Sequence, residues 1–323
     1  MQEQLSRNLG LDLVRVTEAA ALAAGRWMGF GDPDAADRAA VEAMIAAFAE
    51  VDIDGHIVIG EETKLGVHSP LDTGNRVGNR NGPEVDMVID AIDGAHILAK
   101  SHPGAMSVIG AAARGSMLSL APAAYMDKIV VSRDAAAALV PECMNAPAAW
   151  LLALVARMKK RSVRDLVVFV LDRPRHQHLI DEIRSAGARI LLRSEGDVSG
   201  ALAAATSSKV DILMGSGGVP EGLIAACAAK AVGGAMLARL APQTDEERAA
   251  VAAAGLDTKR IYTCDDLVAG RQVIFVATGI TDGVLLSGVT YQGNEGHTQS
   301  LVLRCATGSR RVIQAVHTIE EPG

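Results

Sequence analysis

The hydrophobic positions in the first part of the chain follow two different spacings. Apolar residues recur every three or four positions over residues 11–28 and 35–51, which predicts two amphipathic helices. Asp32 and Pro33 precede the second helix and form a typical helix start, because aspartate caps free amide groups and proline suits the first turn. Short apolar runs predict strands at residues 56–60, 85–90, 106–113 and 128–132. This part of the chain therefore has an α+β pattern.

From about residue 147 onward, helical and strand-like segments alternate, which is typical of an α/β arrangement with parallel strands. The predicted helices are 147–160, 176–186, one after Asp197, one from Pro220, and 245–254. The predicted strands are 166–171, 189–192, 210–214, 273–276, 300–305 and 312–316, with a glycine-rich turn at 215–218. We interpret the chain as an α/β protein in which an α+β lobe, residues 1–145 with 271–323, is fused to an α/β lobe, residues 146–270.

Composition narrows the classes of protein that fit this pattern. The chain is 49% hydrophobic and 21% charged, so it can bury a large core, and its 3% aromatic content predicts close packing of small side chains. The formal net charge of −7 argues against nucleic-acid binding, which requires clustered Lys and Arg. Widely spaced cysteines and the lack of an apolar stretch approaching ~20 residues predict a cytoplasmic protein without disulfides, zinc or membrane spans.

Acidic residues at predicted strand ends and helix starts are the sharpest chemical signal. Asp90 and Asp93 lie three positions apart at the end of a strand, followed by a glycine that allows a tight turn. Glu61 follows the preceding strand, Asp37 lies on the second helix, and Glu221 begins a helix after the glycine-rich segment. Each acid alone is more often a solvated or capping residue, but the group suits Mg²⁺ or Mn²⁺, which prefer oxygen ligands.

A second group of residues has the chemistry of phosphate binding. Arg173 and Arg175 follow a predicted strand, and Tyr125 and Lys128 lie in an earlier one. Arginine forks and a lysine point charge are the side chains that hold a phosphate group that does not react. The alternative interpretation is an ordinary charged loop and helix start.

Several segments in one order resemble the class II fructose-1,6-bisphosphatases, and together they span nearly the whole chain. The segments are Arg15-Val16-Thr17-Glu18, Gly31-Asp32, Ala36-Asp37, Ile57-Val58-Ile59-Gly60-Glu61, Asp90-Ala91-Ile92-Asp93-Gly94, Tyr125-Met126-Asp127-Lys128, Pro174-Arg175-His176, Gly196-Asp197-Val198, Gly217-Gly218-Val219-Pro220-Glu221-Gly222 and Ala277-Thr278-Gly279-Ile280-Thr281-Asp282-Gly283.

The resemblance implies the layered αβαβα sugar-phosphatase fold and hydrolysis of the 1-phosphate of fructose 1,6-bisphosphate, with some relatives also acting on sedoheptulose 1,7-bisphosphate. A homodimer or homotetramer is the corresponding assembly. The implied metal ligands are Asp37, Glu61, Asp90, Asp93 and Glu221, of which Glu61, Asp90 and Asp93 are assigned to catalysis. The residues assigned to the substrate are Gly94, Tyr125, Lys128, Arg173, Arg175, His176, Asp197, Gly218 and Glu221.

The sequence departs from the family pattern at three places, one of which is Pro33, where the family usually has a lysine near the substrate. Ala95 stands where the family has a threonine whose hydroxyl helps to orient the attacking water, and a methyl group cannot do this. Residues 60–64 lack acids that the pattern contains. Two alternatives therefore stay open: a catalytically impaired relative that binds a sugar phosphate, and a phosphatase for a different phosphomonoester.

Overall fold

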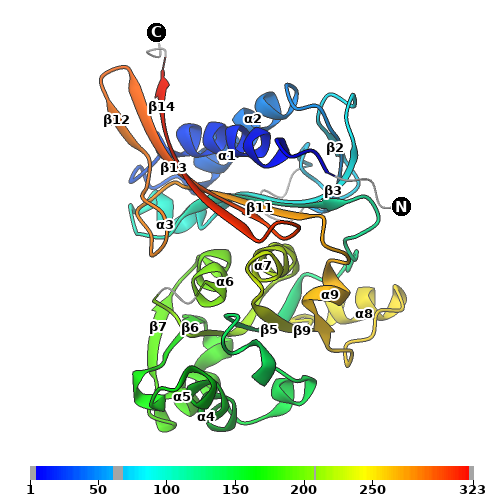
Figure 1. The fold of residues 1–323 in the computed structure, drawn as a ribbon, viewed down its shortest axis with the longest axis vertical. Coiled ribbons are helices and arrows are strands. Elements are labelled where there is room, and N and C mark those ends of the chain that lie inside the picture. The colour runs from blue at the N-terminus through cyan, green and yellow to red at the C-terminus, as the bar shows by residue number, and fades with distance from the viewer. Residues whose placement is uncertain (1–4, 61–67, 207–208, 320–323) are drawn as a thin grey trace. The chain divides into compact units, whose positions relative to one another are not determined.

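The computed structural model describes residues 5–60, 68–206 and 209–319. The contacts of this part of the chain divide it into two compact units, Met1–Met117 with Arg271–Gly323, and Leu118–Gly270 (Figure 1). The first boundary thus differs from the predicted one after residue 145. Strand β5 (Tyr125–Val131) is the reason, because it pairs with strands of the second unit.

The first unit is built on a mixed sheet whose strand order is β12-β13-β11-β4-β3-β1-β2, with β14 paired to β13. Only β1 and β3 pair in parallel, and the pairings of the other described strands of this sheet are antiparallel. Its strands are β1 Asp54–Ile59, β2 Arg76–Val77, β3 Glu84–Asp93, β4 Met106–Ala113, β11 Val273–Gly279, β12 Thr290–Gln292, β13 Glu295–Arg304 and β14 Ser309–Thr318.

Helices α1 (Leu9–Gly25) and α2 (Pro33–Phe48) cover one face of this sheet (Figure 1). Asp32 caps α2 by accepting a hydrogen bond from the Ala35 amide at 2.9 Å, as the sequence predicted. A third short helix, α3 (Ala95–Ala99), follows β3 directly. Leu13, Met44 and Ile89 lie in the buried cluster between these helices and the sheet.

The second unit contains a mixed sheet in the order β10-β9-β5-β8-β6-β7. Strands β6, β7 and β8 are parallel, whereas β5 runs antiparallel to both β8 and β9. Its other strands are β6 Val167–Leu171, β7 Arg189–Arg193, β8 Ile212–Gly218, β9 Ala235–Leu240 and β10 Tyr262–Thr263. Its helices are α4 Ala148–Lys159, α5 Gln177–Ser185, α6 Asp197–Ala205, α7 Val219–Val232, α8 Asp245–Ala253 and α9 Cys264–Leu267.

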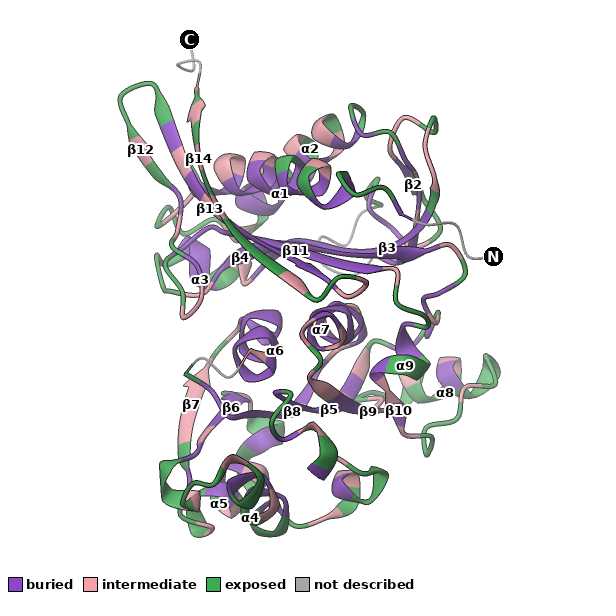
Figure 2. Ribbon diagram, in the orientation of Figure 1, coloured by how far each residue is buried: buried purple, intermediate pink, exposed green. Residues whose placement is uncertain are grey.

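Helices α4 and α5 lie on one face of the second sheet and α6 and α7 on the other (Figure 1). Helices α6 and α7 are buried on nearly all sides (Figure 2), which fits their Ala- and Gly-rich sequences. Glycine permits this packing at two positions, because a Cβ atom at Gly200 would overlap the Phe169 ring and one at Gly222 would overlap the Met126 sulfur. The close packing expected from composition is therefore present.

The structure confirms the predicted α/β class and corrects one detail of it. Gly215, Gly217 and Gly218 were predicted to form a turn, but they extend strand β8. They stay in the strand because residues 215–218 pair with residues 125–128 of β5. None of the helices in the described part of the chain combines the length and the apolar character that a membrane span requires.

We expect Gly200→Ala to destabilise the second unit by about 1 to 3 kcal/mol, because the added methyl group must displace a buried aromatic ring. Urea unfolding followed by circular dichroism measures this change. Gly283→Ala is the matched control, since its Cβ would make only ordinary contacts at 3.4 and 3.8 Å. Equal stability of the two variants would contradict the packing argument.

Candidate functional site

Two of the predicted metal carboxylates lie at the end of β3 in the first unit. Asp90 and Asp93 are 2% and 5% exposed. Strand β1 runs parallel to β3 with Ile59 paired to Val88, so the carboxyl ends of both strands lie at the same edge of the sheet. Glu61 follows β1 in sequence but lies outside the described residues.

A third carboxylate, that of Asp37, lies on α2 and is 3% exposed. Helix α2 packs against β3 and against α3, the two elements that flank Gly94. Gly94 has a left-handed backbone with φ 100°, a conformation that favours glycine, and it turns the chain from β3 into α3. Ala95, where the family pattern has threonine, is the first residue of α3.

The donor chemistry of Asp37, Asp90 and Asp93 fits a hard divalent cation, because carboxylate oxygens are the ligands that Mg²⁺ and Mn²⁺ prefer. All three side chains are buried within one unit. Over residues 5–60, 68–206 and 209–319, however, no three His, Cys, Asp or Glu side chains form a ready metal-binding group. The metal set therefore stays a prediction that includes Glu61.

The predicted substrate residues of the second unit gather at one edge of its sheet. The parallel strands β6, β7 and β8 end there, and antiparallel β5 begins there, since Tyr125 pairs with Gly218. Residues of the predicted set lie in these strands or in the segments that directly follow them: Tyr125, Lys128, Arg173, Arg175, His176, Asp197, Gly218 and Glu221. In α/β sheets, ligands bind outside the carboxyl ends of parallel strands, so this edge is the candidate binding face of the unit.

A buried ion pair joins three elements at this edge. Lys128 of β5 is 1% exposed and forms an ion pair with Asp197, the first residue of α6, which is 7% exposed. The Lys128 ammonium also donates a hydrogen bond to the Gly218 carbonyl at 3.3 Å. A side chain at Gly217 would clash with the Asp197 carboxylate, so the strand must carry glycine there. Lys128 therefore links β5, α6 and β8 at this edge through buried contacts.

His176 joins the loop after β6 to strand β8. Its Nδ1 lies 2.7 Å from the Leu171 carbonyl, and its Nε2 accepts the Ser216 amide at 2.8 Å. A carbonyl only accepts and an amide only donates, so Nδ1 carries the proton and the ring is neutral. Burial lowers the pKa of His176, which favours the same state. Both ring nitrogens are engaged, and the assignment of His176 to the substrate stays a prediction.

Arg175 is held in place but keeps donors available. Its guanidinium donates to the Ser216 carbonyl at 3.0 Å and lies over the Tyr125 ring, 5.3 Å from the ring centre. Arginine has five N–H donors, so this contact leaves others for an anion. Arg173 is less exposed than Arg175, and its guanidinium lies 3.8 Å from the Glu195 carboxylate. The assignment of both arginines to a phosphate group stays a prediction.

Glu221 lies in the first turn of α7, where a carboxylate is favoured by the helix dipole. Its carboxylate lies against Gly218, because a Cβ atom there would clash with it. The assignment of Glu221 to the metal therefore stays a prediction.

Glu247 on α8 also lies at this edge, although the sequence did not point to it as a site residue. Its Oε1 accepts the amides of Ala124 and Tyr125 at 2.8 and 3.0 Å, and its Oε2 accepts the Gln243 amide at 2.7 Å. The spacing of Thr244 and Glu247 is a recognisable helix-start signal. That signal gives no indication of the bonds to Tyr125, which come from a strand more than a hundred positions earlier. Glu247 thus anchors the start of β5 at the candidate binding edge.

Comparison with known proteins places these residues in a wider context. The family described as "Bacterial fructose-1,6-bisphosphatase, glpX-encoded" matches residues 7–317. The chain is 37% identical to the fructose-1,6-bisphosphatase class 2 of Haemophilus influenzae, with 98% of each chain covered. It is 35% identical to the D-fructose 1,6-bisphosphatase class 2/sedoheptulose 1,7-bisphosphatase of Synechococcus sp. (strain JA-3-3Ab), over 97% of this chain and 96% of that protein. The similarity therefore extends over both units.

We expect Glu247→Gln to loosen the start of β5, because an amide group cannot accept all three backbone N–H bonds. Loss of a bond to a charged acceptor, about 1.5 kcal/mol, corresponds to roughly tenfold faster amide exchange at Ala124 and Tyr125. Hydrogen exchange read by mass spectrometry measures this change. Asp245→Asn on the same helix, whose side chain is 91% exposed, serves as the control. Unchanged exchange in the Glu247 variant would show that the anchor is unimportant.

Because His176 is buried, we expect the free energy of unfolding to depend on pH. Its pKa is lowered in the folded state from an ordinary value of 6.5, so the unfolded state binds the proton more tightly. The stabilisation is therefore complete above about pH 6.5 and is lost as the pH falls towards the lowered pKa. Urea unfolding between pH 7.5 and 5 should show a steeper loss of stability for the native chain than for His176→Asn. Parallel profiles would contradict the buried neutral ring.

Proposed function

Since the chain belongs to the bacterial class 2 fructose-1,6-bisphosphatase family, we propose that it hydrolyses the 1-phosphate of fructose 1,6-bisphosphate. Sedoheptulose 1,7-bisphosphate is a second proposed substrate, after the name of the Synechococcus relative. The observation that carries the proposal is the match over nearly the full chain, together with the phosphate-binding chemistry at the edge of the second sheet.

We assign recognition of the sugar phosphate to the second unit. The Arg175 guanidinium, fixed by Ser216 and by the Tyr125 ring, binds the phosphate that is not cleaved. Asp197, held by Lys128, accepts a hydrogen bond from a sugar hydroxyl. Because these side chains are oriented before the substrate arrives, little conformational freedom is lost on binding.

We assign the cleavage chemistry to carboxylates of the first unit. Asp37, Asp90 and Asp93 are buried, so a charge near them is poorly screened by water and interacts strongly. A bound Mg²⁺ or Mn²⁺ would neutralise the negative charge that develops on the phosphoryl group. The residues' own role is to hold their carboxylate oxygens in place, and their positions in the last part of β3 and in the first turns of α2 support this.

Ala95 supports a second candidate function. Without the threonine hydroxyl, the attacking water loses one orienting group, and such a loss can lower turnover by orders of magnitude while binding survives. A sugar-phosphate-binding protein with weak or absent turnover is the alternative.

Phosphate release from fructose 1,6-bisphosphate with Mg²⁺ or Mn²⁺ tests the proposal. We expect turnover by the native chain and at least a hundredfold loss in Asp90→Ala and Asp37→Asn, because each removes a buried carboxylate. Asp34→Asn is the matched control, since Asp34 lies on the same helix but is exposed.

The contrary outcomes separate the two candidate functions. No release by the native chain, combined with calorimetric binding of fructose 1,6-bisphosphate and recovery of turnover in Ala95→Thr, would favour the impaired relative. Neither release nor binding would reject both, and a panel of other phosphomonoesters would then be the next substrate set.

A further inference from the structure

Residues 68–75 run beside the carboxyl end of strand β1 in the first unit. The Gly74 amide donates to the Ile57 carbonyl of β1 at 2.8 Å. The Gly60 amide, directly after β1, donates to the Thr73 hydroxyl at 2.9 Å. Strand β2, which follows this segment, pairs with β1 on the side opposite to β3. The segment therefore continues the sheet by one further chain at the end of β1.

Asp72 of this segment lies at the edge of the sheet where β3 ends. A Cβ atom at Gly60 would lie 2.6 Å from the Asp72 carbonyl carbon, so the two backbones are in contact. At this level of the sheet β1 pairs with β3 through Ile59 and Val88, and Asp90 follows two residues later. Neighbouring strands are about 4.8 Å apart, so the backbone of Asp72 is roughly 10 Å from the end of β3. Side chains from both segments can reach one substrate across this distance.

Asp72 forms a pair with His68 of the same segment. Asp72 is 7% exposed, and its Oδ2 lies 3.1 Å from Nδ1 of His68 and accepts the Ser69 amide at 3.0 Å. Its Oδ1 is buried and has no hydrogen-bond partner in the described part of the chain. The His68 side chain, in contrast, is fully exposed. The pair therefore joins a buried carboxylate with few partners to an imidazole that faces solvent.

This contact determines which ring nitrogen of His68 carries the proton. A carboxylate only accepts hydrogen bonds, so Nδ1 is protonated, and Nε2 of the neutral ring is left as an acceptor. A carboxylate behind a histidine also stabilises the positive charge that forms when Nε2 takes a proton. The turn between the two residues is held by the Asn75 side-chain amide, which donates to the carbonyls of Ser69 and Pro70 at 3.1 and 3.3 Å. His68 is thus oriented as a proton acceptor.

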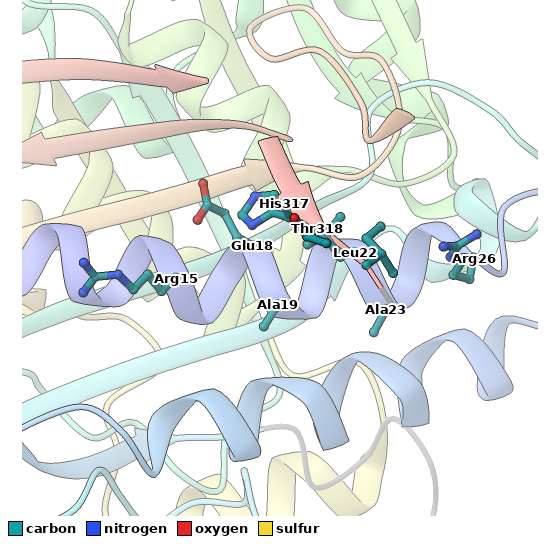
Figure 3. A pocket seen from close by; sticks show the side chains of 9 residues that line it. Arg15, Glu18, Ala19, Leu22, Ala23, Arg26, His317 and Thr318 are labelled. Atoms are coloured by element: carbon teal, nitrogen blue, oxygen red, sulfur yellow. The ribbon is translucent and has the colours of Figure 1, made fainter. Parts of the chain in front are cut away.

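Two other histidines with polar contacts differ from His68 at Nε2. His317 points towards Glu18 in a groove of about 490 Å³ bordered by α1 and the end of β14 (Figure 3). Its Nε2 lies 2.9 Å from the Thr298 hydroxyl and is therefore engaged. Both ring nitrogens of His176 are engaged as well. Nε2 of the exposed His68 ring instead faces solvent, where a water molecule can reach it.

We propose that His68 is the general base of the hydrolysis and that Asp72 positions it, which rests on the phosphatase function proposed above. Nε2 of His68 takes a proton from the attacking water while the water oxygen bonds to phosphorus. The bond between phosphorus and the sugar oxygen breaks, its electron pair stays on that oxygen, and solvent supplies a proton there. The imidazolium then gives its proton to solvent, so the protons balance. His68 thereby assists the attacking water, which Ala95 cannot do.

Phosphate release from fructose 1,6-bisphosphate with Mg²⁺ or Mn²⁺ tests this role. We expect kcat to fall about a hundredfold or more in His68→Gln with KM little changed, because a general base acts in the transition state. Asp72→Asn should lose as much, since its amide donates to Nδ1 and moves the ring proton to Nε2. His178→Gln is the matched control and should keep native turnover, because His178 is also exposed and lies 3.9 Å from Glu182, four positions later.

Two further measurements separate a general base from a structural residue. The ratio of native to His68→Gln turnover should fall between pH 8 and pH 5, because protonation removes the acceptor at Nε2. The charged group that contacts this ring in the described part of the chain is Asp72. NMR of the protein without substrate should show the neutral His68 ring protonated at Nδ1 in the native chain and at Nε2 in Asp72→Asn. Circular dichroism should show that both variants fold.

The outcomes distinguish the role of His68 from the proposed function. Turnover that is unchanged in His68→Gln, a turnover ratio that does not change with pH, or a native ring protonated at Nε2 overturns the role of His68 alone. No release from fructose 1,6-bisphosphate by the native chain overturns the proposed function, and the same variants are then compared on p-nitrophenyl phosphate. Equal rates on that ester, or no release from it, overturn the role of His68 as well.

Discussion

The ion pair between Lys128 and Asp197 is the interaction on which the binding edge of the second unit depends. An ammonium group that is 1% exposed needs a charged partner, since breaking a buried pair costs about 3–5 kcal/mol. The pair ties the middle of β5 to the start of α6, and the bond to Gly218 adds the end of β8. Gly217 is required beside it because any side chain would occupy the space of the carboxylate.

Other side-chain contacts at this edge hold the neighbouring loop and strand ends in place. The neutral ring of His176 accepts the Ser216 amide and so holds the loop after β6 to β8. Arg175 donates to the carbonyl of the same residue. Glu247 holds the start of β5 from the opposite side, through the amides of Ala124 and Tyr125. Each of these side chains bonds to backbone groups of a neighbouring segment, so the arrangement exists before any ligand binds.

The two units place different charged groups at their candidate sites, and this difference fits the roles proposed for them. The first unit buries the carboxylates Asp37, Asp90 and Asp93, which suit a cation. The second unit pairs its buried lysine internally and presents arginine donors at its edge, which suit a phosphate. A family whose named members act on sugar bisphosphates is consistent with both.

Local pattern by itself determined much of this protein: the two opening helices, the Asp32 cap, the α/β alternation and the residue types for metal and phosphate chemistry. These follow from spacing and propensity, which act over a few residues. Tertiary structure alone decided that β5 belongs to the second sheet, that residues 215–218 extend a strand, and that Lys128 points inward. It also decided that Glu247 reaches Tyr125 and that β14 is left as an edge. Strand pairing and burial join residues far apart in sequence, and no local spacing encodes which strand will be the neighbour.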